Sequence, residues 1–454
     1  MGDTETSGKL PARTKFFYGI GDLGNATVNS AIQFFLMKFY TDAALVVPAL
    51  AGSALLIGKI WDAINDPLAG WYTDKAKSRF GKRRVFMIFG AIPLGISIAL
   101  LWFVPAADRV ATFVWIALTF MLFDTLWTFT NVPYYALTSE LTDDYDERSA
   151  LISYRMALAV PAYLVGAALT PVIVGLFALQ RTGFAFIGIV YGALAAAALL
   201  ISAAGIRERG VAAVAPSEAS PLRSFGVALR NKPFLWLCGT YLVINIAFAF
   251  MKTLMAYFIE YQLLMKEQTS LVMGLMLICV TASIPFWRWL GQKMDKGPAY
   301  ALGMAIGALA IAVTFFLPHQ QTPLVYLVAV LGGLGLAAQW IFPWSMVADV
   351  ADFDRAETGQ QRSGMYYGVW GLATKISEAF ALAAVGWILT GVGYVPNVEQ
   401  TPQALLGIRA FFGLIPAVCI FLSLPLLIRY PITRKSHAEV RARLEASESQ
   451  PGAR

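Results

Sequence analysis

The chain has 454 residues, of which 58% are hydrophobic and only 14% are charged, with a formal net charge of +7. Soluble globular domains carry roughly 25% charged residues, so this composition excludes a soluble globular protein. Apolar runs of roughly 20 residues or more recur along the chain, which is typical of membrane-spanning helices and not of an outer-membrane barrel. We therefore expect an all-α integral membrane protein.

Breaks at charged or Pro/Gly/Asn-rich segments predict twelve transmembrane helices in two pseudo-symmetric six-helix bundles. An N-terminal bundle is expected over 1–205 and a C-terminal bundle over 233–429, with a cytoplasmic linker at 206–232 and a cytoplasmic tail at 430–454. The predicted spans are 16–41, 46–73, 84–105, 110–138, 149–177, 183–205, 233–264, 270–293, 298–317, 323–349, 363–391 and 407–429.

Lys and Arg residues gather in three places, between spans two and three, between spans six and seven, and in the tail. By the positive-inside rule these segments and both termini face the cytoplasm of a multi-pass protein in the cell (inner) membrane. Topology accounts for the positive charge, so no nucleic-acid partner is needed. The three cysteines show no metal-binding spacing, and no cofactor is expected.

The first predicted span carries a polar stripe on an otherwise apolar helix. Asp22, Asn25, Asn29 and Gln33 follow one another at spacings of three, four and four residues, which places them on one helix face. Such a face contacts a wet cavity or a partner helix. Amides and an acid beside aromatic rings suit the hydroxyl groups and the ring face of a sugar.

The second span places Asp62, Asn65 and Asp66 inside an apolar run. An acid near the bilayer centre costs at least ~2.5 kcal/mol and is by default part of an ion or substrate pathway. Because Asp62 and Asp66 lie one turn apart, their charges repel unless a cation joins them. The alternative is an internally neutralised network, in which Lys59 satisfies Asp62 and Glu378 pairs with Lys375.

Depth along the helices brings further groups to the level of these acids. Counted at ~1.5 Å per residue from the cytoplasmic ends, Asp66 and Asn131 lie ~12 Å deep, and Asp62 and Lys375 lie ~18 Å deep. Thr128 shares a face with Asn131. Oxygen-only ligation of this kind favours a hard alkali cation over a transition metal.

Four ordered motifs carry a family resemblance: "YGIGDLGN", "WDAINDP", "NVPYYALTSELTDDYDERS" with "SYRM", and "VADVADFDRAETGQQRSGMYYG". With "GWYTDKAKSRFGKRR" between spans two and three, the chain resembles the glycoside–pentoside–hexuronide:cation symporter family of the major facilitator superfamily, whose best-known member is the melibiose permease. The resemblance implies a cation site at Asp62, Asn65, Asp66 and Thr128, with Lys375 nearby.

The same resemblance implies sugar contacts at Arg155 and Trp340. Trp127 and Tyr134, with the neighbouring Tyr135, are possible aromatic platforms. The chain departs from the melibiose permease at Asn131, where that permease has an acid, and the change makes protons a competitor of sodium. The permease's helix-one acid corresponds to Ala26 and the lysine beside it to Asn25, so Asp22 is the expected substitute from one turn away.

Charged residues at the cytoplasmic helix ends form a third candidate group. Opposite charges at the ends of spans from both halves can act as breakable ionic locks, or they are solvated loop ends that obey the orientation rule. The candidates for gating are Asp74, Arg79, Arg148, Asp349, Asp352 and Arg362.

These patterns predict a secondary active symporter that imports a sugar or glycoside with Na⁺ or H⁺ by alternating access, as a functional monomer. The rival substrate class is a lysolipid or another amphipath, because distant relatives with the same cation motif transport such molecules. A non-transporting membrane sensor or scaffold ranks lower, since neither linker nor tail has room for a soluble domain. An enzyme ranks lowest, because no nucleophile–base pair, metal triad or phosphate loop is found in the sequence.

Overall fold

A computed structural model describes residues 10–76, 78–105, 108–142, 144–206, 208, 226, 228–359 and 362–448. The regular secondary structure of these residues is entirely helical, which confirms the all-α prediction. The predicted linker at 206–232 falls largely outside the described residues. The division into two bundles at that linker therefore stays a prediction.

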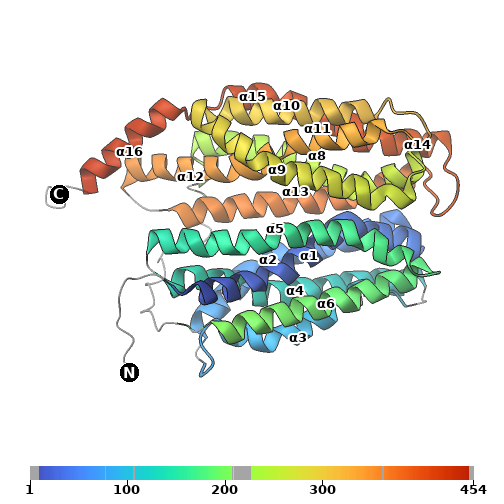
Figure 1. The fold of residues 1–454 in the computed structure, drawn as a ribbon, viewed down its shortest axis with the longest axis horizontal. Helices are drawn as coiled ribbons and strands as arrows, with labels where there is room; N and C mark the ends of the chain where they lie inside the picture. Colours follow the sequence, from blue (N-terminus) through green and yellow to red (C-terminus); the bar gives the residue numbers. More distant parts are fainter. Residues whose placement is uncertain are drawn as a thin grey trace. The chain divides into compact units, whose positions relative to one another are not determined.

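The first half of the chain forms long helices whose ends lie within a few residues of the predicted spans (Figure 1). A short π-helical turn, η1, extends the first of them. In chain order they are α1 (Ala12–Lys38), η1 (Phe39–Ala43), α2 (Pro48–Lys75), α3 (Arg84–Leu101), α4 (Arg109–Leu141), α5 (Tyr145–Gly175) and α6 (Gln180–Gly205).

The second half departs from uninterrupted α-helices in three predicted spans, of which the seventh ends in a π-helical turn. The tenth predicted span is divided after Leu336, and the twelfth contains a π-helical turn. The elements are α8 (Lys232–Tyr257), η2 (Phe258–Gln262), η3 (Lys266–Gln268), α9 (Thr269–Lys293), α10 (Lys296–Thr314), α11 (Leu324–Leu336), α12 (Ala338–Thr358), α13 (Ser363–Gly391), α14 (Pro402–Arg409), η4 (Ala410–Leu414), α15 (Ile415–Ile428) and α16 (Arg434–Glu448).

Local sequence signals set several helix ends. The Asp108 side chain accepts hydrogen bonds from two backbone amides at the start of α4, and Asp144 and Asn231 cap α5 and α8 in the same way. Gly359 ends α12 with a φ of 70°, in the left-handed region that favours glycine. Residues with short polar side chains thus mark the boundaries between long apolar runs.

Ten helical segments among the described residues are long and apolar enough to cross a membrane, so the protein is a multi-pass membrane protein. They correspond to the third to the twelfth predicted spans. The first two predicted spans correspond to α1 with η1 and to α2, which carry the polar stripe and the intramembrane acids. The total of twelve spans stays a prediction.

The chain forms two compact units that do not follow its midpoint. Unit 1 comprises 1–214, 267–274 and 382–401, and unit 2 comprises 215–266, 275–381 and 402–454. The boundary therefore passes through α13, between Ala381 and Leu382. In unit 1, α1 packs against α5 and α6, and α4 packs against α2 and α3 (Figure 1). In unit 2, α10 packs against α11 and α15.

Candidate functional site

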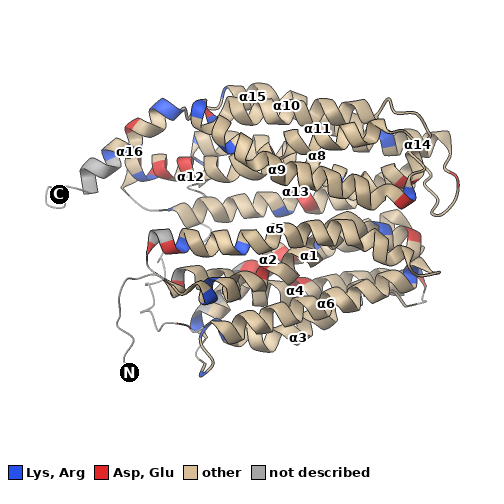
Figure 2. Ribbon diagram, in the orientation of Figure 1, with Lys and Arg blue, Asp and Glu red and all other residues tan. Residues whose placement is uncertain are grey.

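Helices α2 and α4 bring together four of the residues predicted to bind a cation, and we call Asp62, Asn65, Asp66 and Thr128 the α2–α4 cluster. Thr128 Oγ1 donates a hydrogen bond of 3.0 Å to Asp66 Oδ1, and Asn65 Nδ2 donates one of 3.5 Å to the backbone oxygen of Asp124. Asp62, Asn65 and Thr128 are buried, and Asp66 is half-buried. Figure 2 shows red acidic positions on α2 in a part of the ribbon where most residues carry no charge.

Lys59 lies one turn before the acids of the α2–α4 cluster and contacts Asp62. Its Nζ is 3.6 Å from Asp62 Oδ2, and its side chain is 21% exposed while that of Asp62 is 5% exposed. The same ammonium lies 5.7 Å from the centre of the Phe120 ring. The predicted contact between Lys59 and Asp62 is therefore present, but the pair is longer than a close hydrogen-bonded ion pair.

Asp124 is a buried acid of α4 that the sequence reasoning missed. It precedes Thr128 by four residues, so both side chains lie on one face of α4, one turn apart. The sequence could have indicated it, because placing an aspartate in the middle of a predicted span costs as much free energy as placing Asp62 or Asp66 there. In the described middle of α1, α2, α4 and α5, the acids Asp22, Asp62, Asp66 and Asp124 outnumber the cations Lys59 and Arg155.

A second group, which we call the α1–α5 cluster, consists of Asp22, Tyr135 and Arg155. Asp22 Oδ2 lies 3.4 Å from Arg155 Nε, and Asp22 Oδ1 accepts a hydrogen bond of 3.1 Å from the Tyr135 hydroxyl. The Arg155 guanidinium lies 4.9 Å from the centre of the Tyr135 ring, within cation–π range. The predicted pairing of Asp22 with Arg155 is therefore present.

An amide–amide hydrogen bond joins α1 to α4, the helices that carry Asp22 of one cluster and Thr128 of the other. Asn25 Nδ2 donates to Asn131 Oδ1, and both side chains are buried at 2% exposure. Asn131 also donates to the backbone oxygen of Trp127 at 3.0 Å. Asn131 therefore contacts the predicted substrate stripe of α1 directly, although it lies on the helix that carries Thr128.

The other substrate candidates of unit 1 lie on α1 and α4. Tyr134 stacks on Tyr18 with ring centres 5.0 Å apart and donates to the Tyr18 backbone oxygen, so it is a packed residue. Asn29 is exposed and accepts a hydrogen bond from Gln33 at 2.9 Å. Trp127 is half-buried against Phe123.

Trp340 and Lys375 lie in unit 2, on α12 and α13, and are not brought together with the two clusters within one unit. Trp340 follows the break after α11, and Lys375 is half-buried. Glu378 lies 3.5 Å from Nζ of Lys252 on α8, a half-buried cation that the sequence reasoning missed. An ion pair between α8 and α13 thus involves the acid that was considered as a partner of Lys375.

The gating candidates occupy the helix ends. Arg148 Nε donates to the Thr142 backbone oxygen at 2.9 Å, and the Arg79 guanidinium lies 4.8 Å from the Phe80 ring centre. In unit 2, Arg362 lies 3.9 Å from Asp354. Asp349 pairs with Lys296 at 2.6 Å, and Asp352 lies 3.2 Å from His437 on α16. The side chain of Asp74 lies outside the described residues.

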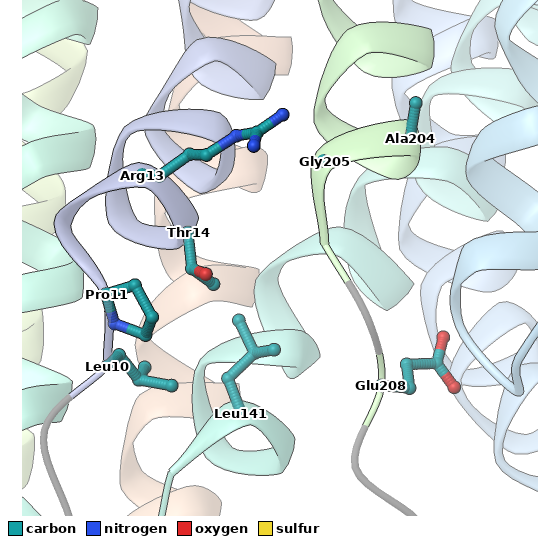
Figure 3. Close-up of a pocket in the computed structure, with 8 residues that line it drawn as sticks. All are labelled: Leu10, Pro11, Arg13, Thr14, Leu141, Ala204, Gly205 and Glu208. Carbon is teal, nitrogen blue, oxygen red and sulfur yellow. The ribbon is translucent and has the colours of Figure 1, made fainter. Parts of the chain in front are cut away.

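A pocket of roughly 530 Å³ opens at the start of α1, where α4 and α6 end (Figure 3). It is lined by Arg13, Thr14, Leu141, Gly205 and Glu208, among others. None of the predicted site residues lines it. The Glu208 carboxylate accepts hydrogen bonds from three successive backbone amides at 82–84 and so holds the start of α3.

Comparison with known proteins gives full-length matches. The family described as MFS/sugar transport protein matches residues 17–434. An uncharacterized symporter of Synechocystis, sll1374, is 30% identical over 98% of this chain and 99% of its own length. The sodium-dependent lysophosphatidylcholine symporter 1 of Gallus gallus is 26% identical over 97% of this chain and 90% of its own.

The putative glycoside/cation symporter YagG of Escherichia coli is also 26% identical, over 90% of each chain. Among solved structures, the partially occluded inward-open xylose transporter XylE of E. coli superposes with a TM-score of 0.63 at 13% identity, over 93% of this chain and 98% of its own. That likeness concerns the fold alone. Because the family match covers most of the described helices, the chain belongs to the MFS/sugar transport protein family of the major facilitator superfamily.

Proposed function

We propose that the protein is a symporter that carries a sugar or glycoside together with Na⁺ or H⁺. The carrying observation is the hydrogen bond between Thr128 and Asp66, which joins α2 and α4 at a group of side-chain oxygens. Carboxylate, amide and hydroxyl oxygens suit a hard monovalent cation, and a proton needs only a carboxylate. Asp62, Asn65, Asp66, Thr128 and Asn131 are the proposed coupling-ion residues.

Charge supports the proposal. Four acids against two cationic side chains in the described middle of α1, α2, α4 and α5 leave this region with an excess of negative charge. A charge at membrane depth costs at least ~2.5 kcal/mol, and one bound cation or proton reduces that cost for an acid. Lys59 Nζ lies 3.6 Å from Asp62 Oδ2, longer than a close hydrogen-bonded ion pair, so a bound cation can compete with it for Asp62.

The α1–α5 cluster suits the substrate. A sugar needs hydrogen-bond donors and acceptors for its hydroxyls and an apolar ring face for its own ring. Asp22, Arg155 and the Tyr135 hydroxyl supply the first, and the Tyr135 ring supplies the second. The name of the YagG relative favours this substrate class.

The Asn25–Asn131 hydrogen bond supplies the physical link that symport requires. A cation bound near Asp66 and Thr128 changes the position of α4, and Asn131 transmits that change to the stripe of α1. Linkage then works in both directions, so that the cation raises the affinity for sugar and the sugar raises the affinity for the cation by the same factor. Alternating access would carry both ligands across the membrane.

The test is uptake by purified protein in liposomes, with a panel of neutral glycosides, pentoses and hexuronates under separate Na⁺ and H⁺ gradients. The expected result is accumulation of at least one sugar driven by one of the gradients, lost in Asp66→Asn and Asp62→Asn. Asp108→Asn is the matched control, because it makes the same change at the exposed N-cap of α4, where asparagine caps equally well. Uphill accumulation by both site variants would refute the coupling role.

A lysolipid is the second candidate substrate, because the lysophosphatidylcholine symporter is as similar to this chain as YagG is, at 26% identity. Counterflow of a labelled lysophosphatidylcholine in the same liposomes separates the two classes. Transport of the lysolipid without transport of any sugar would replace the sugar proposal while keeping the cation site.

A further inference from the structure

A buried ion pair lies at the end of α1 that is remote from the Lys/Arg-rich turn after α2, and we call this side of unit 1 the outer end. Lys38 Nζ is 2.6 Å from Asp42 Oδ2, with side chains 8% and 0% exposed. Thr41 Oγ1 donates a further hydrogen bond of 2.7 Å to Asp42 Oδ1. The pair connects the last turn of α1 to the π-helical turn η1.

The partners that complete this ion pair come from far along the chain, from residues 382–401, which we call the 382–401 segment. The Tyr394 hydroxyl donates to Asp42 Oδ1 at 2.5 Å, and Asn397 Nδ2 donates to the Asp42 backbone oxygen at 2.7 Å. Asn397 has a φ of 60°, in the left-handed region that asparagine tolerates better than most residues. The 382–401 segment thus closes over a charged group that it also satisfies.

A second row of contacts joins the same segment to the start of α2. The Ala49 backbone amide, one of the amides left free at a helix N-terminus, donates to Thr390 Oγ1 at 2.9 Å. Trp387 Nε1 donates to Ser53 Oγ at 3.0 Å. A Cβ added to Gly52 would lie 2.9 Å from the Ala383 backbone oxygen, so the two backbones approach closely.

These contacts involve α13, a continuous helix that belongs partly to each unit. The helix runs unbroken from Ser363 to Gly391, yet residues up to Ala381 belong to unit 2 and residues from Leu382 belong to unit 1. A change in the relation of the units must therefore either bend α13 or release the 382–401 segment. The helix contains no proline, the usual cause of a sharp kink, so release is the easier change.

We propose that the 382–401 segment is a latch, which holds the outer end of unit 1 closed and must release Asp42 and the start of α2 in each transport cycle. The Lys38–Asp42 pair lies within α1 and η1, so it stays paired when Tyr394 and Asn397 leave, and both ions recover hydration when water enters. This inference rests on the proposed function for its role in transport, but the contact and its release are testable without a substrate.

The first test fixes the latch with a disulfide. In a background with Cys238, Cys279 and Cys419 replaced by alanine, the variant Ala49→Cys/Thr390→Cys should cross-link rapidly under mild oxidation. Gradient-driven uptake should then fall at least tenfold and return on reduction, whereas each single variant should be insensitive to oxidant. Failure to cross-link, or unchanged uptake by fully cross-linked protein, would overturn the proposal.

The second test loosens the latch and uses no substrate. In the same background, Ser53→Cys reports opening through its reaction rate with a membrane-impermeant maleimide. Adding Tyr394→Phe should raise that rate at least threefold. The matched control is Tyr191→Phe, which removes a buried tyrosine hydroxyl that contacts Thr170 elsewhere in unit 1 and should leave the rate unchanged. An unchanged rate in Tyr394→Phe would refute the latch whatever the uptake assay shows.

Discussion

Unit 1 holds two lysine–aspartate pairs that look alike in sequence and differ in how they are satisfied. Lys38 and Asp42 are 2.6 Å apart, and Tyr394 and Thr41 complete the hydrogen bonds of a carboxylate that is 0% exposed. Lys59 and Asp62 are 3.6 Å apart, and the lysine side chain is 21% exposed. We call the first pair closed and the second open, because the Lys59–Asp62 contact is longer and the Lys59 side chain is more exposed than that of Lys38.

The difference between Asp42 and Asp62 indicates which intramembrane acids can bind an ion. A buried carboxylate is stable when a cation and hydrogen-bond donors contact both of its oxygens. Binding a further cation there then gains little free energy. Asp62, beside Lys59, lies one helical turn from Asp66 on α2, so an added positive charge lowers the repulsion between these two acids. Four predictions test this contrast.

The largest expected effect on stability is at the closed pair. Asp42→Asn leaves the Lys38 ammonium buried without its counter-ion, which should lower the free energy of unfolding by roughly 3–5 kcal/mol. Thermal unfolding in detergent measures the loss, with Asp108→Asn as the exposed control. The double variant Lys38→Met/Asp42→Asn should recover most of it. Equal stability of Asp42→Asn and wild type would mean that the pair is not closed.

In contrast to Asp42→Asn, we expect Asp66→Asn to change cation binding and not thermal stability. Losing an acid from a region with excess negative charge should not reduce thermal stability, but it should weaken cation binding roughly 100-fold, as expected for removal of a charged oxygen ligand worth up to about 3 kcal/mol. The dependence of the unfolding temperature on Na⁺ concentration, at two pH values, measures the binding of both ions. An unchanged Na⁺ and pH response would remove Asp66 from the site.

The fold was largely predictable from sequence because each span depends on local properties. Apolar length, basic loops and capping residues such as Asp108 and Asn231 lie within the segments that they define. The breaks inside the tenth and twelfth predicted spans were not predictable in this way. The close approach of Gly335 to Gly307 of α10, for example, depends on packing between helices and not on the hydropathy of either one.

The candidate site was predictable where spacing along one helix decides it, as for Asp62, Asn65 and Asp66. Pairs between helices were harder, because the partners lie far apart in sequence. Tyr394 contacts Asp42 across 352 residues, and Lys252 contacts Glu378 across 126 residues. Asp124 is a different case, since its position within a predicted span was visible in the sequence and the residue itself was overlooked.

Thr128 tests the contact between α2 and α4 with a smaller effect. Thr128→Val removes the hydroxyl that bonds to Asp66 but keeps the branched shape, and should weaken cation affinity roughly tenfold, in line with about 1.5 kcal/mol for a hydrogen bond to a charged group. Thr128→Ser keeps the hydroxyl and is the control, expected within about twofold of wild type. Equal affinities in the two variants would show that the hydroxyl is not a ligand.

The smallest expected effect is that of Lys59→Met on cation affinity. Its direction distinguishes an ion-binding site from an internally neutralised network. If Lys59 competes with the coupling ion for Asp62, Lys59→Met should raise cation affinity roughly two- to fivefold, as expected for a partly exposed pair worth less than about 1 kcal/mol. In an internally neutralised network the same change leaves Asp62 uncompensated, so it should lower the unfolding temperature and leave no ion-dependent response. Lys38→Met is the comparison, because a closed pair should lose stability without any gain in cation affinity. Cation titrations of the two lysine variants therefore decide whether the open pair is a binding site or only a weaker version of the closed one.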